Sequence, residues 1–348
     1  MSGAAVRSVI ERAIAARVFP GATAEVGSSA GSVWMDAAGS LTFDNAQTAV
    51  VETPYDLASL TKVIATTTAV MDLVRTGALT LDEPAARSLP EWLGPDREGV
   101  TIEDLLEHTS GLAARLLDAP PSGRREFEHD ICTMPLEYAP RSRSIYSDLG
   151  FILLGFVAAD RGRASLDVIV TNLLARLDAA AARIVFGPIP DAAPTLPMDE
   201  DLRRGRMLVG EVHDNYAAAL GGVAGHAGLF GDVQAVGAFA RELLAAARGE
   251  SRNGAPWTPE LVARFTTRTA VAGSSRALGW DTMLPTSSCG TRMSASAFGH
   301  VGFTGTSLWI DPARDRYFVL LTNRACGGGT LDQMREVRRA FHDAAAVI

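Results

Sequence analysis

The sequence predicts an α+β protein in which an antiparallel sheet, flanked by the N- and C-terminal helices, carries an inserted, mostly helical region. Three features favour this class: strand-like segments near both ends of the chain, amphipathic helical patterns at both termini, and helical patterns between proline- and glycine-bearing loops in the middle. Because sheets and helices bury their apolar faces against another layer, we expect the strands from both ends to form one sheet covered by helices.

The first predicted elements are a helix and a hairpin. Apolar residues recur every four positions, on one face of a helix, at Val6, Ile10, Ile14 and Val18. Two short strand-like segments, residues 21–27 and 32–38, follow with a Ser/Gly-rich turn between them. This pattern predicts a β-hairpin.

The middle of the chain, from about residue 78 to 230, is predicted to be mostly helical. A buried helix leads into it, beginning at or just before Ser59 and ending near Gly77. Residues 149–157 are apolar on nearly every side, which predicts a core helix. The segment 187–201 contains four prolines and is the clearest irregular connection.

Strand character returns near the C-terminus. Four consecutive strands are predicted at residues 278–283, 298–302, 307–310 and 317–321. A turn at Asp311-Pro312 separates the last two. The chain closes with a helix whose apolar face carries Leu331, Met334, Val337 and Phe341.

This order of elements predicts two structural regions. Residues 1–77 and 235–348 together are expected to form a discontinuous α/β sheet domain, and residues 78–234 a helical domain. We expect an active site between them.

Composition excludes several classes of protein. The chain has 348 residues and a formal charge of −8, and it lacks a basic cluster that would indicate nucleic-acid binding. Three widely spaced cysteines, without a C-x-x-C pair, indicate reduced thiols and neither a disulfide framework nor a zinc site. We expect no metal and no cofactor. The sequence leaves the oligomeric state open.

The N-terminal segment does not resemble a secretion signal. Charged residues interrupt its apolar positions, and no window of about 18 uncharged apolar residues exists to cross a membrane. We therefore expect a cytoplasmic protein without a membrane partner.

Lys62 is the only lysine among the 32 lysine and arginine residues of the chain, and it stands three positions after Ser59. On a helix this spacing places a hydroxyl and an amine on one face. A serine hydroxyl is a weak nucleophile that needs a neighbouring base, and a desolvated lysine can be that base, whereas arginine stays charged. The alternative is that Ser59 is only a helix N-cap and Lys62 a surface residue.

Two further clusters carry polar groups suited to catalysis. In Tyr146-Ser147-Asp148, a tyrosine near a lysine can pass protons and the aspartate can hold the lysine. The alternative is that Ser147 or Asp148 caps a helix and Tyr146 packs beneath it. In the segment 299–306, glycines leading into a strand let the backbone approach a ligand, and His300 can titrate or donate a hydrogen bond. Alternatively His300 is satisfied within the sheet.

With these clusters in this order, the chain resembles the serine β-lactamase and penicillin-binding-protein superfamily, on its class C side. The family's Ser-x-x-Lys motif matches Ser59 and Lys62, its Tyr-x-Asn matches Tyr146-Ser147-Asp148, and its Lys-Thr-Gly matches His300-Val301-Gly302. The segments 105–112 and 220–230 also look like the family. The likeness extends from about residue 6 to 345, and it implies a β-lactamase/transpeptidase-like fold.

The resemblance implies an acyl-enzyme mechanism. Ser59 attacks a carbonyl, Lys62 and Tyr146 share the proton transfers, and the N–H groups of Ser59 and Phe303 form the oxyanion hole. Substrate binding or oxyanion stabilisation is assigned to Phe303, His300, Gly302, Asp148 and Thr304.

Two departures from the family pattern bear on the substrate. His300 replaces a lysine that attracts carboxylates, and because histidine is mostly neutral near pH 7, a neutral ester or amide becomes a better candidate than a β-lactam. Arg324 could restore a carboxylate contact. Asp148 replaces Asn, and beside Lys62 it would keep that lysine protonated, which shifts the base role toward Tyr146.

Three other histidines, His108, His213 and His226, have irregular spacing and indicate structural hydrogen bonds, not a metal site. Asp214 and the glycine-rich segment 221–231 are expected to shape the wall of the cleft.

These observations predict a serine hydrolase that acts on a small ester, D-amino-acid amide, peptide or β-lactam through Ser59. A short-chain carboxylesterase is the alternative within the enzyme class. From another class, a sensor module would acylate without turnover. A catalytically inactive relative is a third possibility.

Overall fold

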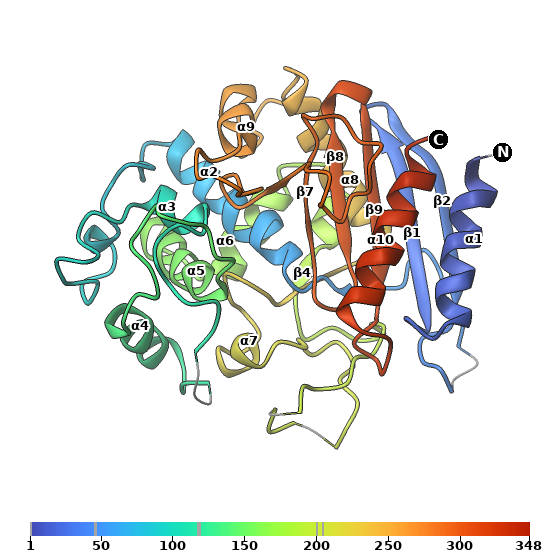
Figure 1. Ribbon diagram of the computed structural model, residues 1–348, viewed down its shortest axis with the longest axis horizontal. Coiled ribbons are helices and arrows are strands. Elements are labelled where there is room, and N and C mark those ends of the chain that lie inside the picture. Colours follow the sequence, from blue (N-terminus) through green and yellow to red (C-terminus); the bar gives the residue numbers. More distant parts are fainter. Residues whose placement is uncertain (1, 45–46, 117–119, 200, 204) are drawn as a thin grey trace.

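The computed structural model describes residues 2–44, 47–116, 120–199, 201–203 and 205–348 (Figure 1). Its α-helices are α1 (Ser2–Ala15), α2 (Thr68–Arg75), α3 (Ile102–Leu106), α4 (Arg124–Thr133), α5 (Asp148–Gly162), α6 (Leu166–Leu174), α7 (Asn215–Ala219), α8 (Val233–Ala247), α9 (Pro259–Thr266) and α10 (Leu331–Ala345). Its strands are β1 (Gly21–Ser28), β2 (Gly31–Gly39), β3 (Tyr55–Asp56), β4 (Val185–Phe186), β5 (Leu229–Gly231), β6 (Asp281–Thr282), β7 (Phe298–Val301), β8 (Ser307–Asp311) and β9 (Arg316–Thr322).

One six-stranded antiparallel sheet joins the two ends of the chain. Its strand order is β2-β1-β9-β8-β7-β6. The central pairing is between β1 and β9, with Ala24 opposite Leu320. Every residue of β1 is buried, because helices cover both faces of the sheet. The predicted α+β class, with an antiparallel sheet built from both termini, is confirmed.

The helices form a layer on each face of this sheet. The terminal helices α1 and α10 lie side by side on one face, and α8 packs against β1 and β9 on the other (Figure 1). The apolar side chains beneath α1 and α10, among them Val6, Ile10 and Phe341, form one core cluster with the sheet. Among the described residues, no helix combines the length and the apolar character needed to cross a bilayer.

The region inserted between the sheet strands contains α3 to α7, with α5 at its centre. The apolar run predicted for residues 149–157 is the buried part of α5. The sequence reading did not find a second, three-stranded sheet of order β3-β5-β4. Its strands are two or three residues long, which is too short for an alternating pattern to appear. The proposed division into domains at residues 77/78 and 234/235 stays a prediction.

Two predicted elements differ from the structure. The strand expected at 278–283 is reduced to Asp281–Thr282, because Gly279 adopts φ +84 in a tight turn closed by a hydrogen bond from Ala277 N to Trp280 O (2.8 Å). The helix expected to begin at or before Ser59 begins at Leu60 and widens into a π-helix over Lys62–Thr67. Such local π-helices occur often at functional sites.

Candidate active site

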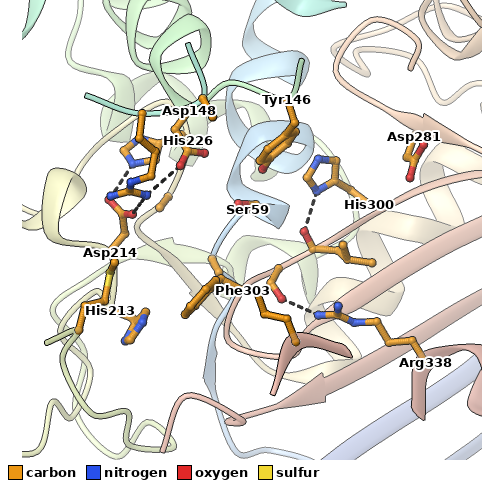
Figure 2. A pocket seen from close by; sticks show the side chains of 18 of the residues that line it. Ser59, Tyr146, Asp148, His213, Asp214, His226, Asp281, His300, Phe303 and Arg338 are labelled. Carbon is orange, nitrogen blue, oxygen red and sulfur yellow. Dashed lines mark hydrogen bonds and ion pairs between the residues drawn. The ribbon is translucent and has the colours of Figure 1, made fainter. Parts of the chain in front are cut away.

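A cavity of about 460 Å³ lies between the helical region and the edge of the large sheet (Figure 2). We call its two sides the helical wall and the strand wall. The helical wall comprises Lys62 beneath the cavity and Arg115, Tyr146, Asp148, Asp214 and His226. The strand wall comprises Arg276, Asp281, residues 300–303 and Arg338. Ser59 lies between the two walls.

Ser59 is held in a turn between β3 and the helix that follows. Asp56, the last residue of β3, accepts a hydrogen bond from Ala58 N through Oδ1 (2.7 Å) and one from His213 N through Oδ2 (2.6 Å). Burial raises the pKa of Asp56 to about 6. Ala58 has φ +47, a conformation that costs a non-glycine residue free energy, so the surrounding contacts must impose it. The turn thereby presents the Ser59 hydroxyl to the cavity.

Lys62 is fully buried, and its ammonium group lies within hydrogen-bond distance of several oxygens of the described residues. Nζ donates to Asp148 Oδ1 at 2.7 Å, to Ser59 Oγ at 3.1 Å and to the carbonyl of His226 at 3.3 Å. Burial alone would lower the pKa of Lys62, but Asp148 and Tyr146 outweigh it and raise the pKa above the ordinary value. The reading of Lys62 as a surface residue is therefore wrong.

The start of α5 positions Tyr146 and Asp148. The Ser147 side chain caps the helix by accepting a hydrogen bond from Gly150 N (3.3 Å), and Ser147 N donates to His108 Nδ1 (3.0 Å). The capping alternative for Ser147 is therefore correct, and it is compatible with a catalytic role for the residues on either side. The Tyr146 ring centroid lies 4.7 Å from Lys62 Nζ.

A network of alternating charges continues behind Lys62. Arg115 donates to Asp148 Oδ2 at 2.9 Å and to Asp214 Oδ2 at 3.1 Å. Asp214 Oδ1 in turn lies 2.7 Å from His226 Nε2. Burial raises the pKa of Asp148, but Lys62, His226 and Arg115 lower it below the ordinary value. His226 and Arg115 likewise lower the pKa of Asp214 against its burial. Both carboxylates are therefore ionised at neutral pH.

Two backbone amides at the cavity are free to bind an oxyanion. The amide N–H of Ser59 and that of Phe303 have no acceptor among the residues that the structure describes. Both residues line the cavity. Such preorganised donors stabilise the negative charge of a tetrahedral intermediate. These are the two amides that the family resemblance implies.

The strand wall carries His300 in a neutral form. His300 Nδ1 donates to the carbonyl of Val301 (2.9 Å), and burial, aided by Arg276 and Lys62, lowers its pKa well below the ordinary value. Gly302 is required at the next turn, because a Cβ there would lie 2.7 Å from Leu57 O. The strand wall therefore has no cation at the position where the family has its lysine.

Two arginines and a threonine hold the loop after β7. Arg324 donates to the carbonyl of Phe303 through Nε (3.1 Å) and Nη2 (2.6 Å), and Arg338 donates to the carbonyl of Gly302 (2.6 Å). Burial lowers the pKa of Arg338. Thr304 does not line the cavity; its buried hydroxyl donates to the carbonyl of Asp56 (2.8 Å). Thr304 and Arg324 thus connect backbone segments, and the predicted ligand contact of Arg324 is not made at the cavity surface.

The structure brings most predicted residues together and adds others. Ser59, Tyr146, Asp148, His300, Gly302 and Phe303 line one cavity, with Lys62 directly beneath. The expected wall residue Asp214 is there as well, together with His213 and His226. Sequence reasoning missed Arg115, Arg276, Asp281 and Arg338, which come from segments without a recognisable motif. The described residues bring no three metal-binding side chains together.

Comparison with known proteins finds relatives over most of the chain. A family model described as Beta-lactamase matches residues 6–342. A relative from Escherichia coli, named "Putative D-alanyl-D-alanine carboxypeptidase", is 30% identical over 320 residues, which cover 82% of this chain and 72% of the relative. A relative of the same name from Salmonella gallinarum is 30% identical over 313 residues, which cover 79% and 70%.

Solved structures share the fold. A class C β-lactamase from Rhodobacter sphaeroides superimposes with a TM-score of 0.74 at 17% identity, covering 98% of both chains. EstCE1, described as a hydrolase with promiscuous acyltransferase activity, gives 0.73 at 20% identity and covers 97% of this chain and 98% of its own. An octameric penicillin-binding protein homologue from Pyrococcus abyssi gives 0.73 at 20% identity and covers 94% and 74%.

Proposed function

The chain belongs to the β-lactamase family, and on that premise we propose that it is a serine hydrolase that forms an acyl-enzyme on Ser59. Its homologues are described as hydrolases, which supports the general reaction type. The observation that carries the proposal is the buried Lys62 ammonium, which lies 3.1 Å from Ser59 Oγ at the base of a cavity with two free amides.

The protonation state of Lys62 assigns its role. An ammonium group has three hydrogens, and Lys62 Nζ donates to Ser59 Oγ, Asp148 Oδ1 and the carbonyl of His226. A hydrogen bond with the Tyr146 side chain further raises the pKa of Lys62. Because one of those hydrogens is directed at Ser59 Oγ, the serine's own hydrogen must point elsewhere. A protonated Lys62 therefore orients Ser59 and stabilises negative charge on its oxygen, and the proton acceptor is a different group.

We assign the role of accepting the serine proton to Tyr146, which lines the cavity with Ser59. Two cations flank its ring: Lys62 Nζ lies 4.7 Å and Arg276 Cζ 4.9 Å from the ring centroid. Both stabilise negative charge that develops on the phenolic oxygen. Asp148 keeps Lys62 protonated, so another group must act as the general base. The position of Tyr146 beside these cations supports that role for its phenolic oxygen.

The proposed reaction has two steps. Ser59 Oγ attacks the substrate carbonyl while its proton passes to the phenolate form of Tyr146, the amides of Ser59 and Phe303 bind the oxyanion, and the leaving group departs with that proton, which restores the phenolate. A water molecule then gives a proton to Tyr146 and attacks the acyl carbon. The bond to Ser59 Oγ breaks, and the proton returns to Ser59.

A short-chain carboxylesterase is the second candidate for the substrate class. The neutral His300 and the exposed apolar side chains at the cavity mouth, Phe303 (43% exposed) and Leu331 (51% exposed), favour a neutral or apolar substrate. The 30% identical relatives, in contrast, carry a carboxypeptidase name, which favours a peptide with a free carboxylate.

Turnover measurements test the proposal directly. p-Nitrophenyl butyrate, nitrocefin and a D-alanyl-D-alanine peptide are incubated with the wild type, with Ser59→Ala and with Ser122→Ala, which alters an exposed loop serine. We expect Ser59→Ala to lose at least about 10⁴-fold in kcat on every substrate that the wild type hydrolyses. Ser122→Ala should match the wild type.

Intact-mass spectrometry separates the remaining alternatives. A transient adduct on the wild type that is absent from Ser59→Ala supports a hydrolase. A permanent adduct without turnover indicates a sensor, and no adduct with any acylating ester indicates an inactive relative. Hydrolysis that persists in Ser59→Ala would contradict the mechanism.

A further inference from the structure

Arg276 brings a positive charge to the strand wall without a carboxylate partner. It lines the cavity, and its guanidinium carbon lies 4.9 Å from the centroid of the Tyr146 ring. Among the described residues it takes part in no ion pair. No hydrogen bond from its guanidinium N–H groups is present among the described residues, so these donors are available to a ligand.

Asp281 brings a negative charge to the same wall. It is the first residue of β6, and it stands opposite Arg276 in an isolated antiparallel bridge. Side chains at such directly opposed positions lie on one face of the sheet, with Cβ atoms about 5 Å apart. Asp281 Oδ1 accepts a hydrogen bond from Thr282 N (3.0 Å), and the described part of the chain gives the carboxylate no cationic partner.

We propose that Arg276 and Asp281 together recognise a free α-amino-acid group of the substrate, that is, one carbon that carries both an ammonium and a carboxylate. Arg276 would bind the carboxylate and Asp281 the ammonium. This inference rests on the proposed hydrolase function and names the substrate class of that same site.

Arg276 and Asp281 together disfavour ligands that carry only one charge or none. A substrate with a carboxylate alone is attracted by Arg276 but repelled by Asp281, and a substrate with an ammonium alone meets the reverse combination. A neutral substrate gains no charge-assisted hydrogen bond from either side chain. His300, beside them on β7, adds no charge because burial lowers its pKa well below the ordinary value. Only a group with both charges satisfies both side chains.

Four matched p-nitroanilides test this proposal. They carry the same scissile amide on γ-linked glutamate (both charges), glutarate (carboxylate only), 4-aminobutyrate (ammonium only) and butyrate (neutral). A second series is one methylene shorter, and both enantiomers of the amino-acid compounds are used. The readout is the ratio of kcat/KM between substrates, which an overall loss of activity or stability does not change.

For the wild type we expect the doubly charged substrate to exceed each singly charged one by about tenfold, the effect of one charge-assisted hydrogen bond. In Arg276→Gln the ammonium-only substrate should become the better of the two singly charged compounds. In Asp281→Asn the carboxylate-only substrate should become the better one.

Three outcomes would overturn the proposal. They are equal rates for all four substrates in the wild type, an order that neither substitution changes, and failure to cleave either series while p-nitrophenyl butyrate is hydrolysed. In each of these cases Ser59-dependent hydrolysis of the butyrate ester would leave the proposed function standing. If Ser59→Ala retains activity, the proposed function itself fails.

Discussion

On the helical wall every charged side chain has a charged partner, whereas on the strand wall, within the part of the chain that the structure describes, the charged side chains are unpaired or bonded only to backbone groups. Lys62, Asp148 and Arg115 form a continuous chain of ion pairs. Across the cavity, Arg338 donates to the carbonyl of Gly302 and Arg276 lies beside the Tyr146 ring. Paired charges fix the position of protons, while unpaired ones remain available to a ligand.

This contrast suggests a division of labour. Buried ion pairs contribute little net stability, because desolvation offsets their attraction, but they hold groups in defined geometry. The helical wall therefore suits proton transfer, which depends on distances of a few tenths of an ångström. The strand wall suits recognition, since its groups gain a partner only when substrate binds. Three predictions examine this contrast, from the largest expected effect to the smallest.

Lys62→Met removes the ammonium while keeping a side chain of similar length. We expect kcat to fall by about 10³-fold or more, because Ser59 loses the group that orients it. The free energy of unfolding should fall by about 2–3 kcal/mol, since the buried Asp148 loses one of its two ion-pair partners and keeps Arg115. Ester hydrolysis and urea denaturation measure the two effects. Retained activity would show that the ammonium group of the helical wall is not required for the reaction.

Asp148→Asn is the matched control for that experiment. It keeps the shape of the side chain but removes the charge that raises the pKa of Lys62. The pKa of Lys62 should therefore fall, and any limb of the pH–rate profile that reflects loss of the Lys62 proton should move to lower pH. An unchanged profile would indicate that Asp148 acts only by its shape.

Arg324→Met addresses the strand wall. The guanidinium holds the carbonyl of Phe303, whose amide faces the cavity. Its removal should loosen the second oxyanion donor and lower kcat by about tenfold, with KM nearly unchanged, because this donor acts mainly in the transition state. Steady-state kinetics on p-nitrophenyl butyrate give the two constants. A change confined to KM would mean that the loop after β7 contributes to binding of the substrate and not to stabilisation of the transition state.

The two walls should lose stability in different pH ranges. The pKa of His300 is lower in the folded protein than in the unfolded chain. As the pH drops below 6.5, the unfolded chain therefore takes up this proton while the folded protein does not, and the free energy of unfolding falls. Asp214 also has a lowered pKa, and its contribution is lost only as the pH drops below 3.8. His300→Gln and Asp214→Asn should each remove the slope of one proton, about 1.4 kcal/mol per pH unit, in its own range.

Denaturant unfolding between pH 2 and 8 measures these slopes. His129→Gln is the surface control: Glu91 raises the pKa of His129, so this substitution cannot reduce the loss of stability below pH 6.5. Identical slopes in His300→Gln and the wild type would show that His300 is not held neutral by its surroundings.

The sequence predicted the fold and the family because both depend on patterns that extend along the chain. Apolar periodicity marked α1 and α10, and three motifs in the right order indicated the β-lactamase family, which the family model confirms. The Ser59-x-x-Lys62 spacing predicted that hydroxyl and amine lie close together, and they lie 3.1 Å apart. The catalytic roles of these residues stay proposals.

The remaining site residues could not be predicted because no local pattern identifies them. Arg115 reaches Asp148 and Asp214 from a loop, and these partners are 33 and 99 positions away in the sequence. Arg276 meets Asp281 through a single bridge in a segment where the predicted strand was mostly wrong. Such contacts depend on tertiary packing, which one sequence does not reveal.

The burial of the only lysine has a practical consequence. In protein grown with ¹⁵N-labelled lysine, the side-chain ammonium region of an NMR spectrum holds one resonance, and it needs no assignment. Following that resonance through a titration reports directly whether the amine beside the serine carries its proton, before and after an inhibitor binds.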